Sequence, residues 1–142
     1  MKNVLTLPRV AYLALGSNLG DRAGHITHAL RLLDERETVT VVCVATLYEN
    51  APMYVDDQPD FINTCAKIET TMRPHKLLEA CLAVEETMGR VRALENGPRN
   101  IDIDVVLYED ELVDDEVLTI PHPGMLERDF VLIPLAEIAP DV

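Results

Sequence analysis

The sequence predicts an α+β fold in which helices pack on a mostly antiparallel sheet and a short appendage follows at the C-terminal end. The length of 142 residues and the content of 48% hydrophobic side chains favour one domain, 1–142, with a core of its own. Short runs rich in β-branched residues alternate with runs of helical periodicity, in the order strand, helix, strand, strand, helix, strand. This βαββαβ order is typical of a ferredoxin-like sandwich.

The first predicted strand and helix are joined by a turn that contains glycine. Val10–Leu15 is a short apolar run, and the turn at 16–21 ends it. The turn lacks the lysine and the spacing of a Walker A loop, so a plain strand-to-helix turn is the favoured interpretation. In the helix that follows, apolar side chains recur at the spacing i, i+4, i+7, at Ile26, Leu30 and Leu33.

The middle of the chain predicts two further strands and a second helix. Residues 38–48 are rich in Val, Thr and Leu and predict a long strand, and 61–71 predicts the next one. Between them, 49–60 contains two prolines and four acidic residues without periodicity, which indicates a functional loop. The helix predicted over 74–88 has an apolar stripe that includes Glu85, so this carboxylate lies either at the rim of the core or beside a polar site.

The last third of the chain predicts one more strand and a helical end. The expected segments are a loop over 89–97, a strand over 101–108, an acidic turn over 109–116, an extended piece over 117–120, a rigid turn over 121–124 and a helix over 125–137.

Two aspartates on the strand predicted over 101–108 indicate a metal site. Side chains two residues apart share a face of a strand, so Asp102 and Asp104 point away from the face that carries Ile103. Carboxylate oxygens suit Mg²⁺, which completes its coordination shell with water and phosphate oxygens. Arg99, just upstream, is of the residue type that binds a phosphate bidentately. On the aspartate pair alone, an edge strand with a solvated acidic face is the favoured interpretation, and the rest of the chain changes this balance.

Charge and cysteine content narrow the class of protein. The formal net charge of −13 argues against a general binder of nucleic acid or of acidic membranes. The three cysteines are far apart and form no CxxC motif, so we expect buried thiols in a reduced, cytoplasmic protein. The N-terminal residues contain no long apolar run, so we expect neither a signal peptide nor a transmembrane helix.

Six short motifs follow one another in a recognisable order. They are GSNLGD at 16–21, DQPDFIN at 57–63, GRVR at 89–92, GPRNIDID at 97–104, PHP at 121–123 and RDFVL at 128–132. Together, from about residue 10 to residue 140, they resemble the 6-hydroxymethyl-7,8-dihydropterin pyrophosphokinases of folate biosynthesis. The resemblance implies that the pyrophosphoryl group of ATP is transferred to the hydroxymethyl oxygen of the pterin, by attack at the β-phosphorus and with release of AMP.

The same resemblance implies roles for individual residues. Asp102 and Asp104 match the family's two magnesium-binding aspartates, with two Mg²⁺ ions forming a clamp for in-line displacement. Arg90 and Arg99 match arginines that act on the triphosphate, so these four residues are the expected catalytic set. The positions expected to contact ATP are Glu85, Arg90, Arg92, Arg99, Val105 through its backbone, Thr119, His122 and Arg128. The positions expected to line the pterin pocket are Asn50, Met53, Phe61, Asn63 and Phe130.

The expected pterin pocket has a simple chemical logic. A flat heterocycle fits between aromatic rings, and Phe61 and Phe130 are the only two phenylalanines of the chain. The side-chain amide of Asn63 both donates and accepts hydrogen bonds, as the edge of a pterin requires. Without the resemblance, two core phenylalanines and a polar residue at a strand edge would be the favoured interpretation.

Two other functions fit parts of the pattern. Glycosyltransferases that use nucleotide sugars also carry an Asp-x-Asp metal site, but that site normally belongs to a larger nucleotide-binding fold. A non-catalytic ferredoxin-like module that binds a pterin or a nucleotide would have no need of both aspartates. We therefore expect ATP and the pterin as small-molecule substrates, no nucleic-acid or membrane partner, and association with neighbouring folate-pathway enzymes.

Overall fold

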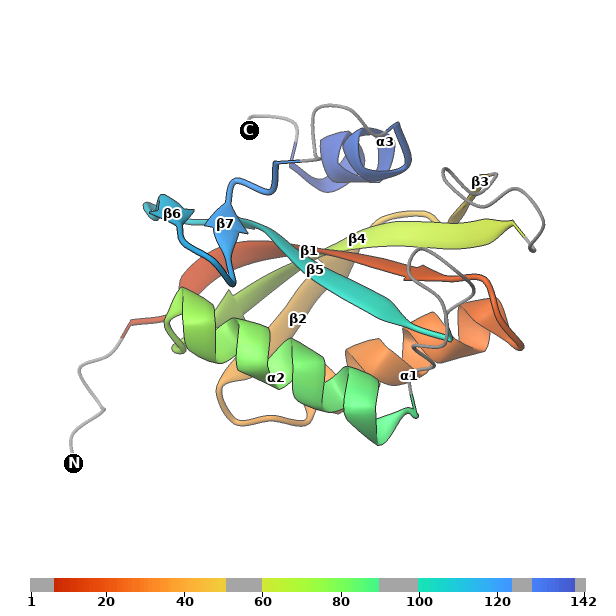
Figure 1. Cartoon of the computed structure of the whole chain (residues 1–142), viewed down its shortest axis with the longest axis horizontal. Coiled ribbons are helices and arrows are strands. Elements are labelled where there is room, and N and C mark those ends of the chain that lie inside the picture. Colours follow the sequence, from red (N-terminus) through yellow and green to blue (C-terminus); the bar gives the residue numbers. More distant parts are fainter. Residues whose placement is uncertain (1–6, 51–59, 90–99, 124–128, 140–142) are drawn as a thin grey trace.

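The computed structural model in Figure 1 describes residues 7–50, 60–89, 100–123 and 129–139. The main sheet contains β1 (Arg9–Ser17), β2 (Val39–Val44), β3 (Tyr48–Asn50), β4 (Phe61–Thr70) and β5 (Asp102–Tyr108). The helices are α1 (Arg22–Asp34), α2 (Pro74–Thr87) and α3 (Asp129–Ile138), and β6 (Val113–Asp114) pairs with β7 (Thr119–Ile120) in a small second sheet. No helix within these described ranges is long and apolar enough to cross a membrane.

The sheet has the strand order β2-β4-β1-β5, with β3 pairing with β4 beyond the end of β2, and all of its strand pairs are antiparallel. Each of the two βαβ halves places its helix on the same face of the sheet. This arrangement confirms the predicted ferredoxin-like fold. The two central strands, β1 and β4, pair over their whole lengths, from Arg9↔Thr70 to Ser17↔Ile62.

The strand predicted over 38–48 is interrupted in the structure. Val44 pairs with Ala66 and Tyr48 pairs with Asn63, so four steps along one chain match only three along β4. The extra residue breaks the ladder, and β2 and β3 are therefore separate strands. Because β3 includes Asn50, the predicted loop begins later than residue 49, and its residues 51–59 lie outside the described ranges.

The lower face of the sheet in Figure 1 carries the larger hydrophobic core, beneath α1 and α2. The α1 helix begins after a turn in which Gly20 has a φ of +71°, and the Asp21 carboxylate then accepts a hydrogen bond from Gly24 N at 3.2 Å. The core residues alternate along the strands and recur every three or four residues along the helices. They include Leu13, Leu15, Ile26, Leu33, Ile68, Leu77, Val84, Ile101, Ile103 and Val105.

The C-terminal helix α3 covers the opposite face of the sheet (Figure 1). The sequence predicted a helix over 125–137 as an appendage, and the described helix runs from Asp129 to Ile138. Its buried side chains pack on Cys65 of β4 and Val106 of β5, in a smaller cluster that includes Val131, Leu135 and Ala139. The fold therefore has three layers, because α3 packs on the face of the sheet opposite α1 and α2.

The segment between β5 and α3 contains a short hairpin. Strands β6 and β7 pair through Val113↔Ile120 and Asp114↔Thr119, where the sequence predicted an acidic turn followed by an extended piece. The Asp115 carboxylate accepts hydrogen bonds from the backbone of Val117 and Leu118, each at 3.0 Å, which closes this hairpin. The hairpin places β7 beside β5, the edge strand that carries the aspartate pair.

Candidate functional site

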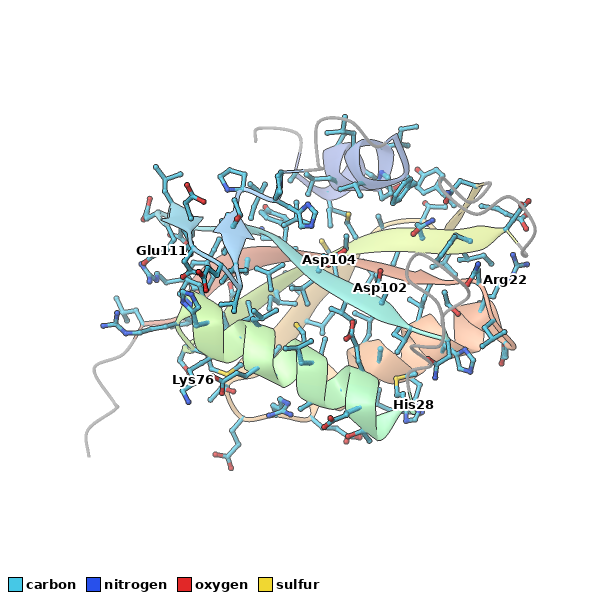
Figure 2. All side chains as sticks on the ribbon, viewed as in Figure 1. Arg22, His28, Lys76, Asp102, Asp104 and Glu111 are labelled. Atoms are coloured by element: carbon cyan, nitrogen blue, oxygen red, sulfur yellow. The ribbon has the colours of Figure 1, made fainter. Side chains whose placement is uncertain are left out.

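Strand β5 presents acidic side chains on one face and apolar side chains on the other. Ile103 and Val105 are 3% and 2% exposed within the core under α1 and α2. Asp102 and Asp104, which follow each other along β5 in Figure 2, are half-buried and alternate with these core residues. The predicted orientation is confirmed, because the two carboxylates lie on the face of the sheet on which α3 packs. Val106, further along β5 on the same face, is the residue that contacts α3.

The chemistry of this donor set fits magnesium. Two carboxylates from one strand supply hard oxygen ligands and leave the remaining positions of an octahedral shell to water and phosphate oxygens. No cluster of three or more His, Cys, Asp or Glu side chains that could hold a metal occurs among the described residues. The described residues therefore form no cage made wholly of protein ligands.

A row of paired residues joins the aspartates to the predicted pterin pocket. Asp102 pairs with Gly16 on β1, Gly16 pairs with Asn63 on β4, and Asn63 pairs with Tyr48 on β3. Neighbouring strands lie about 4.8 Å apart, so the backbones of Asp102 and Asn63 are separated by about 10 Å on one face of the sheet. The structure thus brings the predicted metal ligands and the predicted pterin residues together.

Gly16 makes the space between these two groups. A Cβ atom at this position would lie 2.6 Å from Oδ1 of Asn63 and 3.6 Å from Cδ1 of Phe61. Any larger residue would therefore displace the Asn63 amide, which lies over the backbone of β1 because Gly16 has no side chain. Sequence reasoning interpreted the segment around Gly16 as a turn and as one motif of the resemblance. The close approach of Gly16 to Asn63 was not predicted, because it depends on strand pairing.

The described pterin-side residues converge from three elements. Asn63 is 7% exposed, and its Nδ2 atom donates a hydrogen bond to Oδ1 of Asn50, which pairs Phe61 across the β3–β4 ladder. Phe61 is half-buried at the start of β4, and Phe130 is half-buried at the start of α3, where it packs against the smaller core. Two aromatic rings and one amide on this face have the composition that a flat heterocycle requires.

Glu85 supports the strand that carries the two aspartates at its outer edge, opposite the edge that pairs with β1. It lies on α2, is 2% exposed, and its Oε2 atom accepts a hydrogen bond from the backbone N of Ile103 at 2.7 Å. Ile103 lies between Asp102 and Asp104, on a strand whose outer edge has no β partner in the main sheet. The position of Glu85 within an apolar stripe was the sequence signal for this contact, and its contact with ATP stays a prediction.

Cys81 of α2 lies in the core beneath the sheet. Burial, and after it the charges of Glu85 and Asp104, raise the pKa of the Cys81 thiol to about 12. The neighbouring carboxylates therefore influence a group in the core beneath the sheet.

The predicted nucleotide-side residues on the hairpin also lie near β5. Thr119 belongs to β7, and the backbone N of His122 donates to the carbonyl of Val106 at 2.9 Å. The side chain of Val105 is buried in the core, so only its backbone is available to a nucleotide, as the resemblance implied. These contacts place the hairpin along the outer edge of the strand that carries Asp102 and Asp104.

Comparison with known proteins agrees with this geometry. Residues 12–140 match the family model of 7,8-dihydro-6-hydroxymethylpterin-pyrophosphokinase, HPPK. The chain belongs to this family. The HPPK family membership confirms the resemblance on which the residue roles were predicted.

Bacterial HPPK relatives match over most of both chains. The 2-amino-4-hydroxy-6-hydroxymethyldihydropteridine pyrophosphokinase of Methylorubrum extorquens is 48% identical over 93% of this chain and 84% of the relative. That of Bacillus subtilis is 44% identical over 94% of this chain and 80% of the relative.

A fungal relative is much longer than this chain. The folic acid synthesis protein fol1 of Schizosaccharomyces pombe is 50% identical over 96% of this chain, which spans only 19% of that longer protein.

A solved structure supports the fold. The Plasmodium falciparum HPPK-DHPS, determined with pteroate, superposes with a TM-score of 0.72 over 91% of this chain and 38% of that chain. The sequence identity is 16%, so this similarity concerns the arrangement of helices and strands.

Five predicted site residues lie outside the described ranges, namely Met53, Arg90, Arg92, Arg99 and Arg128. Two residues that flank or support the site were not predicted. Asn100 Nδ2 donates to the carbonyl of Met88 at 2.6 Å, which ties the start of β5 to the end of α2. Glu137 of α3 binds the segment before β3. Asn100 lies within the GPRNIDID motif but was assigned no role, and Glu137 lies in none of the motifs. Neither contact was predictable, because each depends on a partner elsewhere in the sequence.

Proposed function

We propose that this chain transfers the pyrophosphoryl group of ATP to the hydroxymethyl group of 6-hydroxymethyl-7,8-dihydropterin, releasing AMP, as a step of folate biosynthesis. The observation that carries the proposal is the row from Asp102 through Gly16 to Asn63, which joins a pair of carboxylates to an amide and aromatic pocket on one face. Membership of the HPPK family supports the same reaction.

The reaction exchanges one phosphorus–oxygen bond for another. The pterin hydroxyl oxygen forms a bond to the β-phosphorus of ATP, the bond from that phosphorus to the oxygen bridging the α- and β-phosphates breaks, and the hydroxyl proton is released. AMP leaves with the bridging oxygen. Such a displacement needs the two substrates held in line and their charge offset, so positioning is the main contribution of the protein.

The aspartate pair would hold the metal ions of this reaction. Asp102 and Asp104 would bind one or two Mg²⁺ ions, which neutralise phosphate charge and orient the attacking hydroxyl when bound. The carboxylates lie on a strand that is fixed on both sides, by β1 along its inner edge and by Glu85 at its outer edge. This rigid support keeps the two ligands at a constant spacing.

The pterin and the nucleotide would occupy opposite parts of the face. Asn63 would read the heterocycle edge while Phe61 and Phe130 cover its faces. Asn50 would orient Asn63 through the hydrogen bond between their amides. Met53 would also line the pterin pocket. Arg90 and Arg99 would act on the triphosphate. The further contacts to ATP would come from Glu85, Arg92, Val105, Thr119, His122 and Arg128.

The wider setting of the reaction forms part of the same proposal. The chain would act as one pyrophosphokinase domain and associate with neighbouring folate-pathway enzymes, since the fission-yeast and pea relatives are a longer folic acid synthesis protein and a folate synthesis bifunctional protein. A cytoplasmic location is supported by three free cysteines, which suit a reducing compartment. Co-purification with a dihydropteroate-forming enzyme would test the association.

Separation of adenine nucleotides after incubation with ATP, Mg²⁺ and the pterin tests the proposed reaction. We expect AMP that forms only when the pterin is present and that disappears when EDTA removes the metal. ADP would indicate transfer of the γ-phosphoryl group and would overturn the proposal. Binding of the pterin without any nucleotide product would favour the non-catalytic module instead.

A further inference from the structure

Glu137, in the last turn of α3, makes an unusual concentration of contacts for an exposed carboxylate. Its Oε2 atom accepts hydrogen bonds from the backbone N and from Oγ1 of Thr46, each at 3.0 Å. Its Oε1 atom accepts a hydrogen bond from the hydroxyl of Tyr48 at 2.7 Å. One side chain of the C-terminal helix therefore binds Tyr48, the first residue of β3, and Thr46, two residues before it, which lie about ninety positions earlier in the sequence.

Strand β3 has little support of its own. It comprises three residues, Tyr48–Asn50, and pairs only with β4 within the described part of the sheet. A strand this short, separated from β2 by an irregular step, gains few ladder hydrogen bonds. Three hydrogen bonds to a charged acceptor are a substantial addition to such a segment.

The end of β3 leads directly to the pterin side of the site. Tyr48 pairs with Asn63, and Asn50 pairs with Phe61. The Asn63 Nδ2 atom donates to Oδ1 of Asn50, which orients the Asn63 amide and leaves its Oδ1 over Gly16. A displacement of β3 would therefore change the orientation of Asn63.

We propose that Glu137 is a positioning residue for the pterin pocket, which acts through Thr46, Tyr48 and β3 to fix the amides of Asn50 and Asn63. This inference rests on the proposed function, because it assigns Glu137 to the pterin side of that site. Glu137 touches neither substrate in this account. It anchors α3, which also carries Phe130, to the strand that orients Asn63, and so holds an aromatic wall and the amide of the pocket in one arrangement.

The ionisation of Glu137 is consistent with this role. The hydrogen bond from Tyr48, followed by that from the Thr46 backbone, holds the pKa of the Glu137 carboxyl below its ordinary value. The same hydrogen bond raises the pKa of the Tyr48 hydroxyl. At neutral pH the pair is therefore a carboxylate accepting from a protonated phenol, which is the strong form of this contact.

Steady-state kinetics of Glu137→Ala, Glu137→Gln and Tyr48→Phe test the proposal. Glu137→Ala should raise the KM for the pterin about tenfold, because a charge-assisted hydrogen-bond network is lost, and change the KM for ATP less than about twofold. Glu137→Gln should restore most of the pterin KM, since its amide can accept from Thr46 and donate to the Tyr48 oxygen. Tyr48→Phe removes one contact and should raise the pterin KM about threefold.

A matched control separates this role from a general loss of charge. Glu86→Ala removes an exposed carboxylate from α2, on the other face of the sheet, and should leave both KM values unchanged. The side-chain amide resonances of Asn63 in an NMR spectrum should shift in Glu137→Ala and stay in place in Glu86→Ala. This second measurement requires no activity.

The outcomes distinguish the two proposals. A wild-type protein that forms no pterin-dependent AMP would overturn the proposed function. An active wild type whose Glu137→Ala variant folds, keeps its pterin KM and keeps its Asn63 amide resonances would overturn the positioning role alone. Equal increases in the KM for ATP and for the pterin would likewise contradict it, and Tyr48→Phe gives the same test if Glu137→Ala does not fold.

Discussion

The two faces of the sheet share the same strands but have different surroundings. Beneath α1 and α2, apolar side chains form one continuous cluster along the whole sheet. On the other face, α3 covers a smaller cluster, and the rows beside it carry Asp102, Gly16 and Asn63. Side chains alternate between the two faces along each strand. On β1, Leu13 therefore lies in the core, whereas Gly16 lies on the face of the proposed site. The completed core fixes the strands, and the partly covered face carries the residues of the proposed site.

The largest expected effect is the loss of turnover at Asp104, on the site face, without the loss of stability expected for a residue of the core face. Replacing Asp104 by Asn should reduce turnover about 100-fold or more, because a metal ion would lose an anionic ligand. The free energy of unfolding should change by less than about 1 kcal/mol, because the side chain is half-buried and keeps its shape. Measurement of AMP formation and of chemical denaturation on the same preparation checks both. Near-wild-type turnover at ordinary magnesium concentrations would refute the assignment.

A pair of substitutions on β1 sharpens the comparison. Gly16→Ala should raise the KM for the pterin about tenfold, since the new Cβ would lie 2.6 Å from the present position of Asn63 Oδ1 and the amide must move. Leu13→Ala should instead lower the free energy of unfolding by about 2–5 kcal/mol, since Leu13 is completely buried, and leave the pterin KM of the folded protein unchanged. If both variants altered only stability, Gly16 would belong to the scaffold and not to the site.

A smaller effect concerns the thiols. The expectation that they are buried is confirmed for Cys65 and Cys81, one on each face of the sheet, and is wrong for Cys43, which is exposed. Burial raises the pKa of Cys65, on the α3 face, and of Cys81, on the α2 face, to about 12 in both cases. At pH 8 a thiol reagent should therefore modify only the exposed Cys43 of the folded protein, and all three thiols after unfolding. Because the folded state favours the protonated thiols, its stability should fall as the pH rises above about 9 toward 12.

Rapid modification of Cys65 at pH 8 would show that α3 does not cover its part of the sheet in solution. Modification of Cys81 at the same rate would instead question the packing of α2. The reaction of Cys43 serves as the internal reference for both rates.

The sequence predicted those features that depend on local spacing. The alternation of Asp102 and Asp104 with Ile103 followed from the period of a strand, and Glu85 was conspicuous within an apolar helix stripe. Pairing along β4 was not predictable in the same way, so the break between β2 and β3 was missed. The face that α3 covers also depends on packing between elements that are distant in the sequence, and this is why Glu137 gave no signal.

The pterin residues show the limit of reasoning from composition. Phe61, Asn63 and Phe130 are ordinary strand and helix residues when the sequence is considered alone. The strand register places Phe61 and Asn63 on the face of the aspartates, and the packing of α3 brings Phe130 to the same face. The resemblance to HPPK selected them, and the register explains how they can act together. The roles of the residues within 51–59, 90–99 and 124–128 remain predictions of that resemblance.

The most direct test of the account locates the metal. Crystals grown with Mn²⁺, which accepts the same oxygen ligands as Mg²⁺, and with a non-hydrolysable ATP analogue would give an anomalous difference map. The account predicts a peak within about 2.0–2.3 Å of carboxylate oxygens of Asp102 and Asp104, which is metal-ligand distance. A well-occupied nucleotide whose metal peak lies away from both carboxylates would contradict the central claim that this face of β5 is the catalytic centre.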